Sequence, residues 1–209
     1  MLIAGASGHA MELLSVLQAN GYGEQIVFYD DISGGTGSDT LSSYQVLHSP
    51  AEASDYFQTA PAFCIGVGNP KARKLLAARL RDAGGTLSSV ISADAFIGKH
   101  RVRLGQGLNI MQGAVITTDT TIGDGVLVHV HASVHHDTLI GDYSELSPGC
   151  RILGGATIGA GVSVGTNAVV MRNVRIGDHA VIGAGAVVTR DVAAGETVIG
   201  VPARSISKK

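Results

Sequence analysis

Aliphatic residues recur at every sixth position through the second half of the chain. From Leu104 to Val188, steps of six residues meet fifteen positions, and each holds Leu, Ile or Val. This period is typical of a parallel β-helix, in which each six-residue segment supplies one strand of a three-sided coil. Because no insertion interrupts the period, we predict an unbroken β-helix over residues 93–193 and a C-terminal tail over 194–209, with no long loop covering a neighbouring subunit.

A second period indicates the length of one coil. Glycine follows the aliphatic residue at positions that are eighteen residues apart, namely 105, 123, 141, 159 and 177. Three strands of six residues give this spacing, so the same corner returns once in each coil. We attribute these glycines to corner backbone angles that residues with a Cβ rarely adopt. About five coils should then stack from residue 104 to 193, each burying its aliphatic side chains against the next.

The first half of the chain alternates short apolar segments with segments of helical spacing. An apolar segment at residues 2–4 leads into the glycine loop GASGH at 5–9, and apolar residues at Met11, Leu14 and Leu17 predict a helix over 10–20. The same reasoning predicts strands at 26–29, 62–67 and 87–91, a helix at 71–83 and a loop at 33–43. This alternation predicts a Rossmann-like α/β domain over residues 1–92, with a small parallel sheet and helices on its faces.

Composition excludes several classes of protein. The chain is 45% hydrophobic and 15% charged, as in soluble globular proteins, and its net charge of −2 provides no field for nucleic acid. No apolar run approaches the roughly 20 residues that span a membrane, and no signal peptide is recognised. Cys64 and Cys150 lie in apolar settings without metal-type spacing. We therefore expect a cytoplasmic protein in which both cysteines are reduced core residues.

Four of the eight histidines fall within residues 128–137, and Asp137 follows the last of them. The sixfold register places His129 and His135 directly after an inward aliphatic residue, at or near a corner. His136 and Asp137 come next, so His136 should not be buried inside the coil. Polar residues at such corners are usually solvated, which is the simplest interpretation of His129 and His131.

A metal site is disfavoured by the coil period. Zinc needs three or four converging ligands, and ligands stacked on one face should recur at multiples of eighteen residues. The positions eighteen residues from His136 are Thr118 and Gly154, and those from His131 are Gly113 and Gly149. None of these is a ligand. A site shared between subunits, as in the trimeric β-helix carbonic anhydrases, stays open.

His136 is a better candidate for a general base. Imidazole has an unperturbed pKa of about 6.5, which suits proton abstraction near neutrality. An adjacent carboxylate such as Asp137 can hold one tautomer and stabilise the imidazolium. In the first half, backbone N–H groups of the glycine loop favour phosphate oxygens, and the carboxylates at Asp30 and Asp31 can accept from a ribose or base donor. The alternatives are an ordinary βα turn and a strand-end turn.

These motifs together resemble a bacterial family of sugar O- and N-acetyltransferases. The family includes sialic acid O-acetyltransferases and the bacillosamine-type and perosamine-type nucleotide-sugar N-acetyltransferases. The resemblance covers nearly the whole chain and rests on GASGH at 5–9, FYDD at 28–31, IGVGN at 65–69, VHHD at 134–137, IGDY at 140–143, SPG at 147–149 and GVPAR at 200–204.

The resemblance implies a left-handed β-helix and a homotrimer. Acetyl-CoA would lie in the groove between neighbouring β-helices, and the N-terminal domain would hold a nucleotide-sugar. Transfer would be direct, without metal or acyl-enzyme, with His136 as the base and Asp137 as its partner. Carried over residue by residue, the nucleotide-sugar contacts fall on Ser7, Gly8, His9, Asp30, Asp31 and Gly66. The acetyl-CoA contacts fall on Glu145, Thr166 and Ala184.

Two positions depart from the family pattern. Glu145 stands where relatives commonly have a histidine that contacts acetyl-CoA, and His129-Val130 replaces Asn-Thr or Asn-Ser. Both positions should lie near the reacting groups, so they affect which acceptor sugar is used and whether the chain is active. The basic tail residues Arg204, Lys208 and Lys209 are candidates for the phosphates of CoA, although basic chain ends are more often simply solvated.

We therefore predict acetyl transfer from acetyl-CoA to the amino group of a nucleotide-linked deoxyamino sugar, in the biosynthesis of a cell-surface glycan. Three alternatives remain open: O-acetylation of sialic acid or a related sugar, a metal-dependent β-helix lyase, and a structural or sugar-binding subunit. The identity of the sugar, of its nucleotide and of the acetylated position does not follow from the residues.

Overall fold

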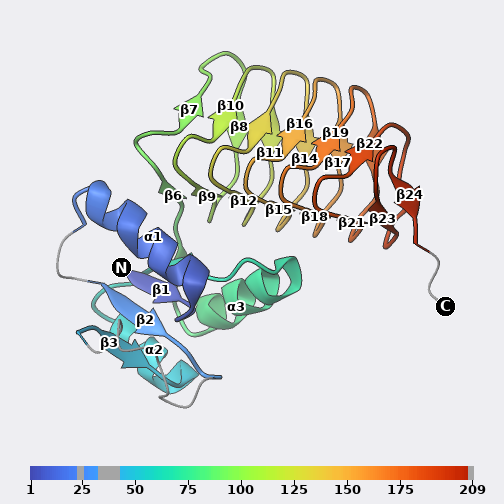
Figure 1. Ribbon diagram of the computed structural model, residues 1–209. Coiled ribbons are helices and arrows are strands. Elements are labelled where there is room, and N and C mark those ends of the chain that lie inside the picture. Colours follow the sequence, from blue (N-terminus) through green and yellow to red (C-terminus); the bar gives the residue numbers. More distant parts are fainter. Residues whose placement is uncertain (23–25, 33–42, 207–209) are drawn as a thin grey trace.

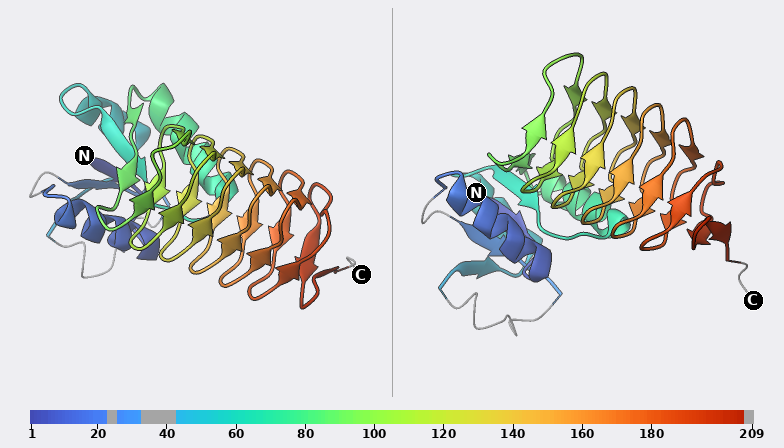
Figure 2. Two further views of the ribbon diagram at one scale, coloured as in Figure 1. Left: turned by 90° about the horizontal axis from the view of Figure 1, so that it is seen from above. Right: turned by 45° about the horizontal axis from the view of Figure 1, so that its top comes forward.

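The computed structural model describes residues 1–22, 26–32 and 43–206 of the 209-residue chain. It contains an α/β domain followed by a parallel β-helix (Figure 1). Two further views show that the α/β domain lies against the early coils and that the last coils extend beyond it (Figure 2). In the part of the chain that is described, no helix is both long and apolar enough to cross a membrane.

The α/β domain is built on five parallel strands in the order β3-β2-β1-β4-β5. The strands are β1 (Leu2–Ala4), β2 (Val27–Tyr29), β3 (Gln45–Leu47), β4 (Ala62–Ile65) and β5 (Thr86–Leu87). The helices are α1 (Gly8–Ala19), α2 (Pro50–Phe57) and α3 (Pro70–Asp82). Helix α1 packs on one face of the sheet, and α2 and α3 pack on the other. The predicted α/β domain is confirmed.

One strand and one helix of this domain were absent from the prediction. The edge strand β3 is short and only its last residue is buried, so it carries little apolar signal. Helix α2 has a recognisable start, because Ser49 caps it through a hydrogen bond from the Glu52 N–H and Pro50 opens its first turn. The predicted loop at 33–43 lies, apart from Ser43, outside the described residues.

The β-helix has three sheets, which we number in chain order. The first sheet contains β6 (Val90–Ile91), β9 (Asn109–Ile110), β12 (Leu127–Val128), β15 (Glu145–Leu146), β18 (Ser163–Val164), β21 (Val181–Ile182), β23 (Thr197–Ile199) and the antiparallel β24 (Arg204–Ser205). The second contains β7 (Phe96–Ile97), β10 (Val115–Ile116), β13 (Ser133–Val134), β16 (Arg151–Ile152), β19 (Val169–Val170) and β22 (Val187–Val188). The third contains β8 (Arg103–Leu104), β11 (Thr121–Ile122), β14 (Leu139–Ile140), β17 (Thr157–Ile158) and β20 (Arg175–Ile176).

The sixfold register is confirmed, because the aliphatic residue that ends each two-residue strand points into the coil. From Ile110 to Val188 every one of these positions is at most 2% exposed. Leu104 is the exception at 37%, since β8 is the end strand of the third sheet and no earlier coil covers it. Cys64 and Cys150 are buried free thiols, as predicted.

The prediction that unusual backbone angles require the corner glycines was wrong. Gly105 does not adopt a positive φ; an added Cβ there would lie 2.5 Å from Asp124 Oδ1 in the next coil. The left-handed conformation occurs two residues later, at Gly107 with φ of 66° and at Tyr143 with φ of 54°. The glycines that follow the aliphatic residues are therefore required by the close approach of successive coils.

The junction between the domains also differs from the prediction. Residues 87–91 do not form one closing strand, because β5 ends the α/β sheet at Leu87 and β6 already pairs with β9 of the β-helix. The first sheet packs against the α/β domain around Arg73, a fully buried residue of α3. Its guanidinium donates to the carbonyls of Ile65, Val67 and Gly125 and, at 2.7 Å, to Asn109 Oδ1.

Candidate active site

His136 and Asp137 lie together at the corner between the second and third sheets, which we call the His136 corner. Asp137 has φ of 57°, so the chain turns there and the two adjacent side chains can meet. Asp137 Oδ2 lies 2.8 Å from His136 Nδ1, and both side chains are more than half exposed. A carboxylate only accepts hydrogen bonds, so His136 Nδ1 carries the ring proton. His136 Nε2 keeps its lone pair and can accept a proton from a substrate.

Gly154 provides the surface beneath the His136 ring. It lies one coil further along the same corner, and an added Cβ there would be 2.5 Å from His136 Nε2. Gly154 does not have a positive φ, so the close approach of the imidazole, and not backbone conformation, requires glycine. The eighteen-residue spacing of the coil identifies this neighbour in the sequence, although Gly154 was not among the predicted site residues.

Part of the predicted nucleotide-sugar site lines a cavity of about 150 Å³ at the carboxyl ends of β1 and β2. The cavity is lined by Gly5, Ala6, Ser7, Tyr29, Asp30, Asp31, Ile32, Val67 and Leu76. Asp31 forms an ion pair with Arg79. The Ser7 side chain makes no capping hydrogen bond to α1, whereas Ser49 and Asn69 cap α2 and α3. The first N–H groups of α1, at Gly8 and His9, are thus not taken up by a side-chain cap.

Gly66 has a packing role beside this cavity. An added Cβ would lie 2.7 Å from Ile3 Cγ2 and 3.1 Å from the Ala4 carbonyl oxygen, so the end of β4 can approach β1 only with glycine here. The switch point of the sheet lies between these two strands, since β2 lies on one side of β1 and β4 on the other. Ligands of open α/β sheets bind at such a point.

His9 turns away from this cavity and meets the β-helix. Glu12 lies one turn further along α1, and its Oε2 is 3.2 Å from His9 Nδ1 and 3.2 Å from His129 Nε2. The two imidazole centroids are 5.5 Å apart. His129 is therefore a domain contact and not a solvated corner residue. Glu12 was not among the predicted site residues, although its i+3 spacing from His9 places both on one helix face.

Burial keeps the two imidazoles of this cluster neutral, and hydrogen bonds determine which ring nitrogen carries the proton. Burial lowers the pKa of His9 to about 4 and also lowers that of His129, so both rings are neutral near pH 7. The Val130 N–H donates to His129 Nδ1 at 2.9 Å, which leaves the ring proton on Nε2, facing Glu12. A metal on that Nε2 would require a proton on Nδ1, where the Val130 N–H already donates. Although three ligand-type atoms converge, the geometry is that of a hydrogen-bonded bridge.

The predicted acetyl-CoA residues lie away from His136 within one chain. Thr166 and Ala184 are one coil apart at the corner between the first and second sheets, which also holds His129 and which we call the His129 corner. Glu145 lies in the first sheet, where burial raises its pKa and the Ser147 hydroxyl donates to it at 2.6 Å. Among the tail residues, Arg204 is exposed and donates to the Ala203 carbonyl, while Lys208 and Lys209 lie outside the described residues.

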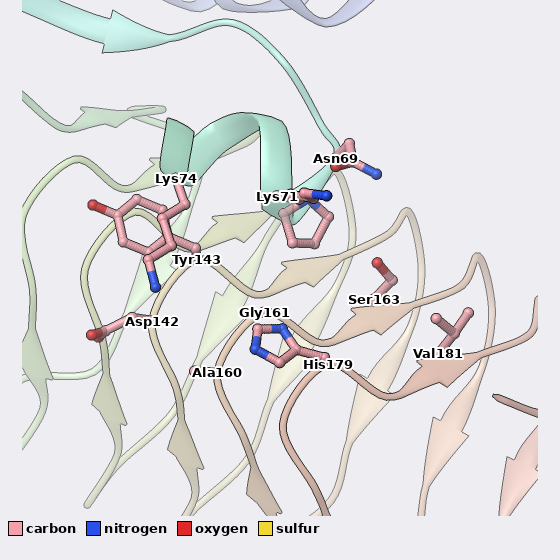
Figure 3. A pocket seen from close by; sticks show the side chains of 11 residues that line it. Asn69, Lys71, Lys74, Asp142, Tyr143, Ala160, Gly161, Ser163, His179 and Val181 are labelled. Carbon is pink, nitrogen blue, oxygen red and sulfur yellow. The ribbon is translucent and has the colours of Figure 1, made fainter. Parts of the chain in front are cut away.

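A larger cavity of about 530 Å³ lies at the third corner, between the start of α3 and the β-helix. Lys71 and Lys74 line it from α3, and Tyr143 and His179 line it from the β-helix (Figure 3). None of the predicted site residues lines this cavity.

Comparisons with known proteins match both halves of the chain. Residues 1–80 match the family described as the PglD N-terminal domain, and residues 119–154 and 155–190 match the bacterial transferase hexapeptide repeats. The GDP-perosamine N-acetyltransferase of Escherichia coli is 31% identical over 160 residues, which are 73% of this chain and 69% of that protein.

Solved structures resemble the whole chain. PerB from Caulobacter crescentus, in complex with CoA and GDP-perosamine, has a TM-score of 0.88 and 29% identity, covering 99% of this chain and 96% of its own. The acetyltransferase domain of PglB from Neisseria gonorrhoeae, in complex with acetyl coenzyme A, has a TM-score of 0.86 and 29% identity, covering 98% of each chain.

Proposed function

Because the chain belongs to the hexapeptide-repeat nucleotide-sugar N-acetyltransferases, the family of GDP-perosamine N-acetyltransferase, we propose that it acetylates the amino group of a nucleotide-linked deoxyamino sugar in the biosynthesis of a cell-surface glycan. It is an acetyl-CoA-dependent sugar N-acetyltransferase. The observation that carries the finer proposal is the hydrogen-bonded His136–Asp137 pair on the β-helix. A cytoplasmic location is part of the proposal, since Cys64 and Cys150 are free thiols.

In this mechanism His136 acts as the general base. The amine nitrogen of the sugar attacks the thioester carbon of acetyl-CoA, and its proton passes to His136 Nε2. The carbon–sulfur bond breaks, and the CoA thiolate takes this proton from the His136 imidazolium as it leaves, which returns His136 to its neutral form. Asp137 stabilises the imidazolium that forms between these steps. General-base help of this kind contributes roughly 10²–10⁴ in rate, and the rest comes from positioning two bound substrates.

The nucleotide-sugar is assigned to the crevice at the carboxyl end of the α/β sheet. The uncapped start of α1 favours the diphosphate, since its N–H groups carry partial positive charge. We assign Asp30 and Asp31, which line the cavity at the end of β2, to hydrogen bonds from the ribose or base. Ser7, Gly8, His9 and Gly66 complete the assigned contacts.

A homotrimer with sites between subunits is part of the proposal. The first sheet of the β-helix packs against its own α/β domain, whereas the His136 corner joins the other two sheets. Thr166 and Ala184, assigned to acetyl-CoA, lie at a different corner from His136. A sugar held by one chain therefore needs the His136 corner of a neighbouring copy, and threefold symmetry supplies it three times.

A panel of UDP-, dTDP- and GDP-linked amino sugars with acetyl-CoA tests the proposal through release of the CoA thiol. We expect rapid thiol release with at least one 4-amino or 3-amino nucleotide-sugar, and release of only background thiol with the matching hydroxyl sugars. Turnover confined to hydroxyl acceptors such as sialic acid would replace the proposal with O-acetylation. Absence of turnover with every sugar would indicate a binding or structural subunit.

A further inference from the structure

We propose that Glu12, held between His9 and His129, binds the sugar half of the acceptor by accepting a hydrogen bond from one of its hydroxyl or amino groups. The inference deepens the proposed function and rests on it, because it names the residue that distinguishes a nucleotide-sugar from its nucleotide. Glu12 is not among the residues that the family resemblance assigns to this site, and its partner His129 stands where relatives often have Asn.

The hydrogen bonds leave one oxygen of Glu12 available. Both imidazoles approach Oε2, at 3.2 Å each, and both are neutral donors near pH 7 because burial lowers their pKa values. Oε1 has no partner among the described residues, and the side chain is 50% exposed. The cluster therefore presents a free carboxyl oxygen in a fixed orientation, which suits a hydrogen-bond donor on a ligand.

Glu12 lies at the right distance along α1 for a sugar. A diphosphate at the start of α1 would sit at Gly8 and His9, and Glu12 is one helical turn away, about 6 Å at a rise of 1.5 Å per residue. That distance is comparable to the width of a single sugar ring. The contact of Glu12 with His129 shows that this face of α1 meets the β-helix, so a sugar extending along α1 from the diphosphate would approach the β-helix at Glu12.

The same corner of the β-helix connects this position to the acetyl donor. His129 shares its corner with Thr166 and Ala184, the residues assigned to acetyl-CoA, which follow two and three coils later. With about 4.8 Å between neighbouring strands, these coils lie about 10 and 14 Å along the axis. Acetyl-CoA extended along this corner would bring its acetyl end toward His129, and thus toward the sugar at Glu12.

The substitution Glu12→Gln tests the inference, because it changes the free atom and preserves the bridge. The amide oxygen of Gln can still accept from both imidazoles, and its NH₂ group then replaces the free Oε1, so an acceptor becomes a donor. We expect the Kd for the nucleotide-sugar to rise roughly ten- to a hundredfold, since a hydrogen bond to a charged group is lost. The Kd for the parent nucleoside diphosphate and the KM for acetyl-CoA should stay within about twofold.

Asp55→Asn on α2 is the matched control, because it removes one exposed carboxylate from the same domain without touching the bridge. An unchanged Kd for the nucleotide-sugar in the Glu12→Gln variant would overturn the inference, and so would equal losses for nucleotide and nucleotide-sugar, which indicate a structural role. Binding is measured by calorimetry without turnover. If the protein binds nucleotide-sugars but never acetylates them, the proposed function is wrong. The calorimetric Kd values of the Glu12→Gln variant would still decide whether Glu12 binds the sugar.

Discussion

At the scale of single residues, the candidate base depends on two neighbours of different kinds. Asp137 orients His136 through the 2.8 Å contact at Nδ1, and Gly154 leaves room for the ring from the next coil. Asp137 is adjacent in the sequence and could be proposed from it. Gly154 is a neighbour only because one coil contains eighteen residues, so its role depends on how the coils stack.

Replacing His136 by alanine should lower kcat at least about a hundredfold, because no other group would take the proton of the attacking amine. Acetyl-CoA should bind as it does to the wild type, measured by calorimetry. His100→Ala, at the same corner and likewise exposed to solvent, is the control and should keep full activity. Turnover close to that of the wild type in the His136 variant would exclude the general-base mechanism.

Gly154→Ala should lower kcat about tenfold or more without unfolding the protein. The new Cβ would lie 2.5 Å from His136 Nε2, so the exposed ring must rotate away and lose Asp137. Steady-state kinetics and thermal unfolding measure the two effects. Gly68→Ala is the control, since an added Cβ meets no atom within 4 Å there. Equal kcat values for the two variants would contradict the role of Gly154.

At the scale of elements, two helices join the domains by polar contacts. Helix α3 provides Arg73, whose guanidinium bonds the end of β4 to the β-helix. Helix α1 provides His9 and Glu12, which meet His129. Both helices begin at the edge of the sheet where the nucleotide-sugar is proposed to bind, so we expect the contacts that orient the domains to orient the substrate as well.

Acidification should weaken the α1 contact. Burial lowers the pKa of His9 from 6.5 to about 4, with Glu12, Arg73 and His129 as its charged or titratable neighbours. The unfolded chain therefore binds a proton more readily, and the stability that neutral His9 contributes is present above pH 6.5 and lost as the pH falls toward 4. By pH 5 the loss should be about 2 kcal/mol, at 1.36 kcal/mol for each pH unit.

Urea unfolding at pH 7 and pH 5 measures this dependence. His9→Gln should reduce the difference between the two pH values, because the titrating group is removed, whereas the exposed His100→Gln should retain it. If the His9 variant and the wild type lose the same stability on acidification, the buried neutral imidazole is not the cause.

At the scale of the whole molecule, the proposed site combines parts of more than one chain. The proposed sugar crevice belongs to the α/β domain, which packs against the first sheet of the β-helix, whereas His136 lies at the corner between the second and third sheets. Sedimentation equilibrium should accordingly give a particle of three times the 21.3 kDa chain mass.

Mixed trimers test the shared site directly. A chain with His136→Ala keeps its sugar crevice, and a chain with Asp31→Ala keeps its base, so each alone should be inactive. When the two are unfolded together and reassembled, random association should restore about a quarter of the wild-type activity, because one interface in four combines both intact halves. Failure to restore activity, with trimers present, would place the whole site within one chain.

The sequence by itself determined the β-helix and the type of the first domain. Residues 104–188 repeat one local pattern, and each repeat can bury its aliphatic residue only by stacking on the next, so the period dictates the coil. His136 and Asp137 could be paired in advance because they are adjacent. The short edge strand β3 escaped prediction, since few of its residues are buried and its position depends on pairing with β2.

The tertiary structure alone decided which residues meet across the domains. Glu12 and His129, or Arg73 and Gly125, are far apart in the chain, and no local period relates a helix of one domain to a corner of the other. It also decided why certain glycines are required, since the crowding at Gly105 and Gly154 comes from the next coil or from an imidazole above, and not from the backbone angles of these residues. Contacts of this kind join residues that are distant in the chain, so they can be identified only when the positions of both partners in the folded molecule are known.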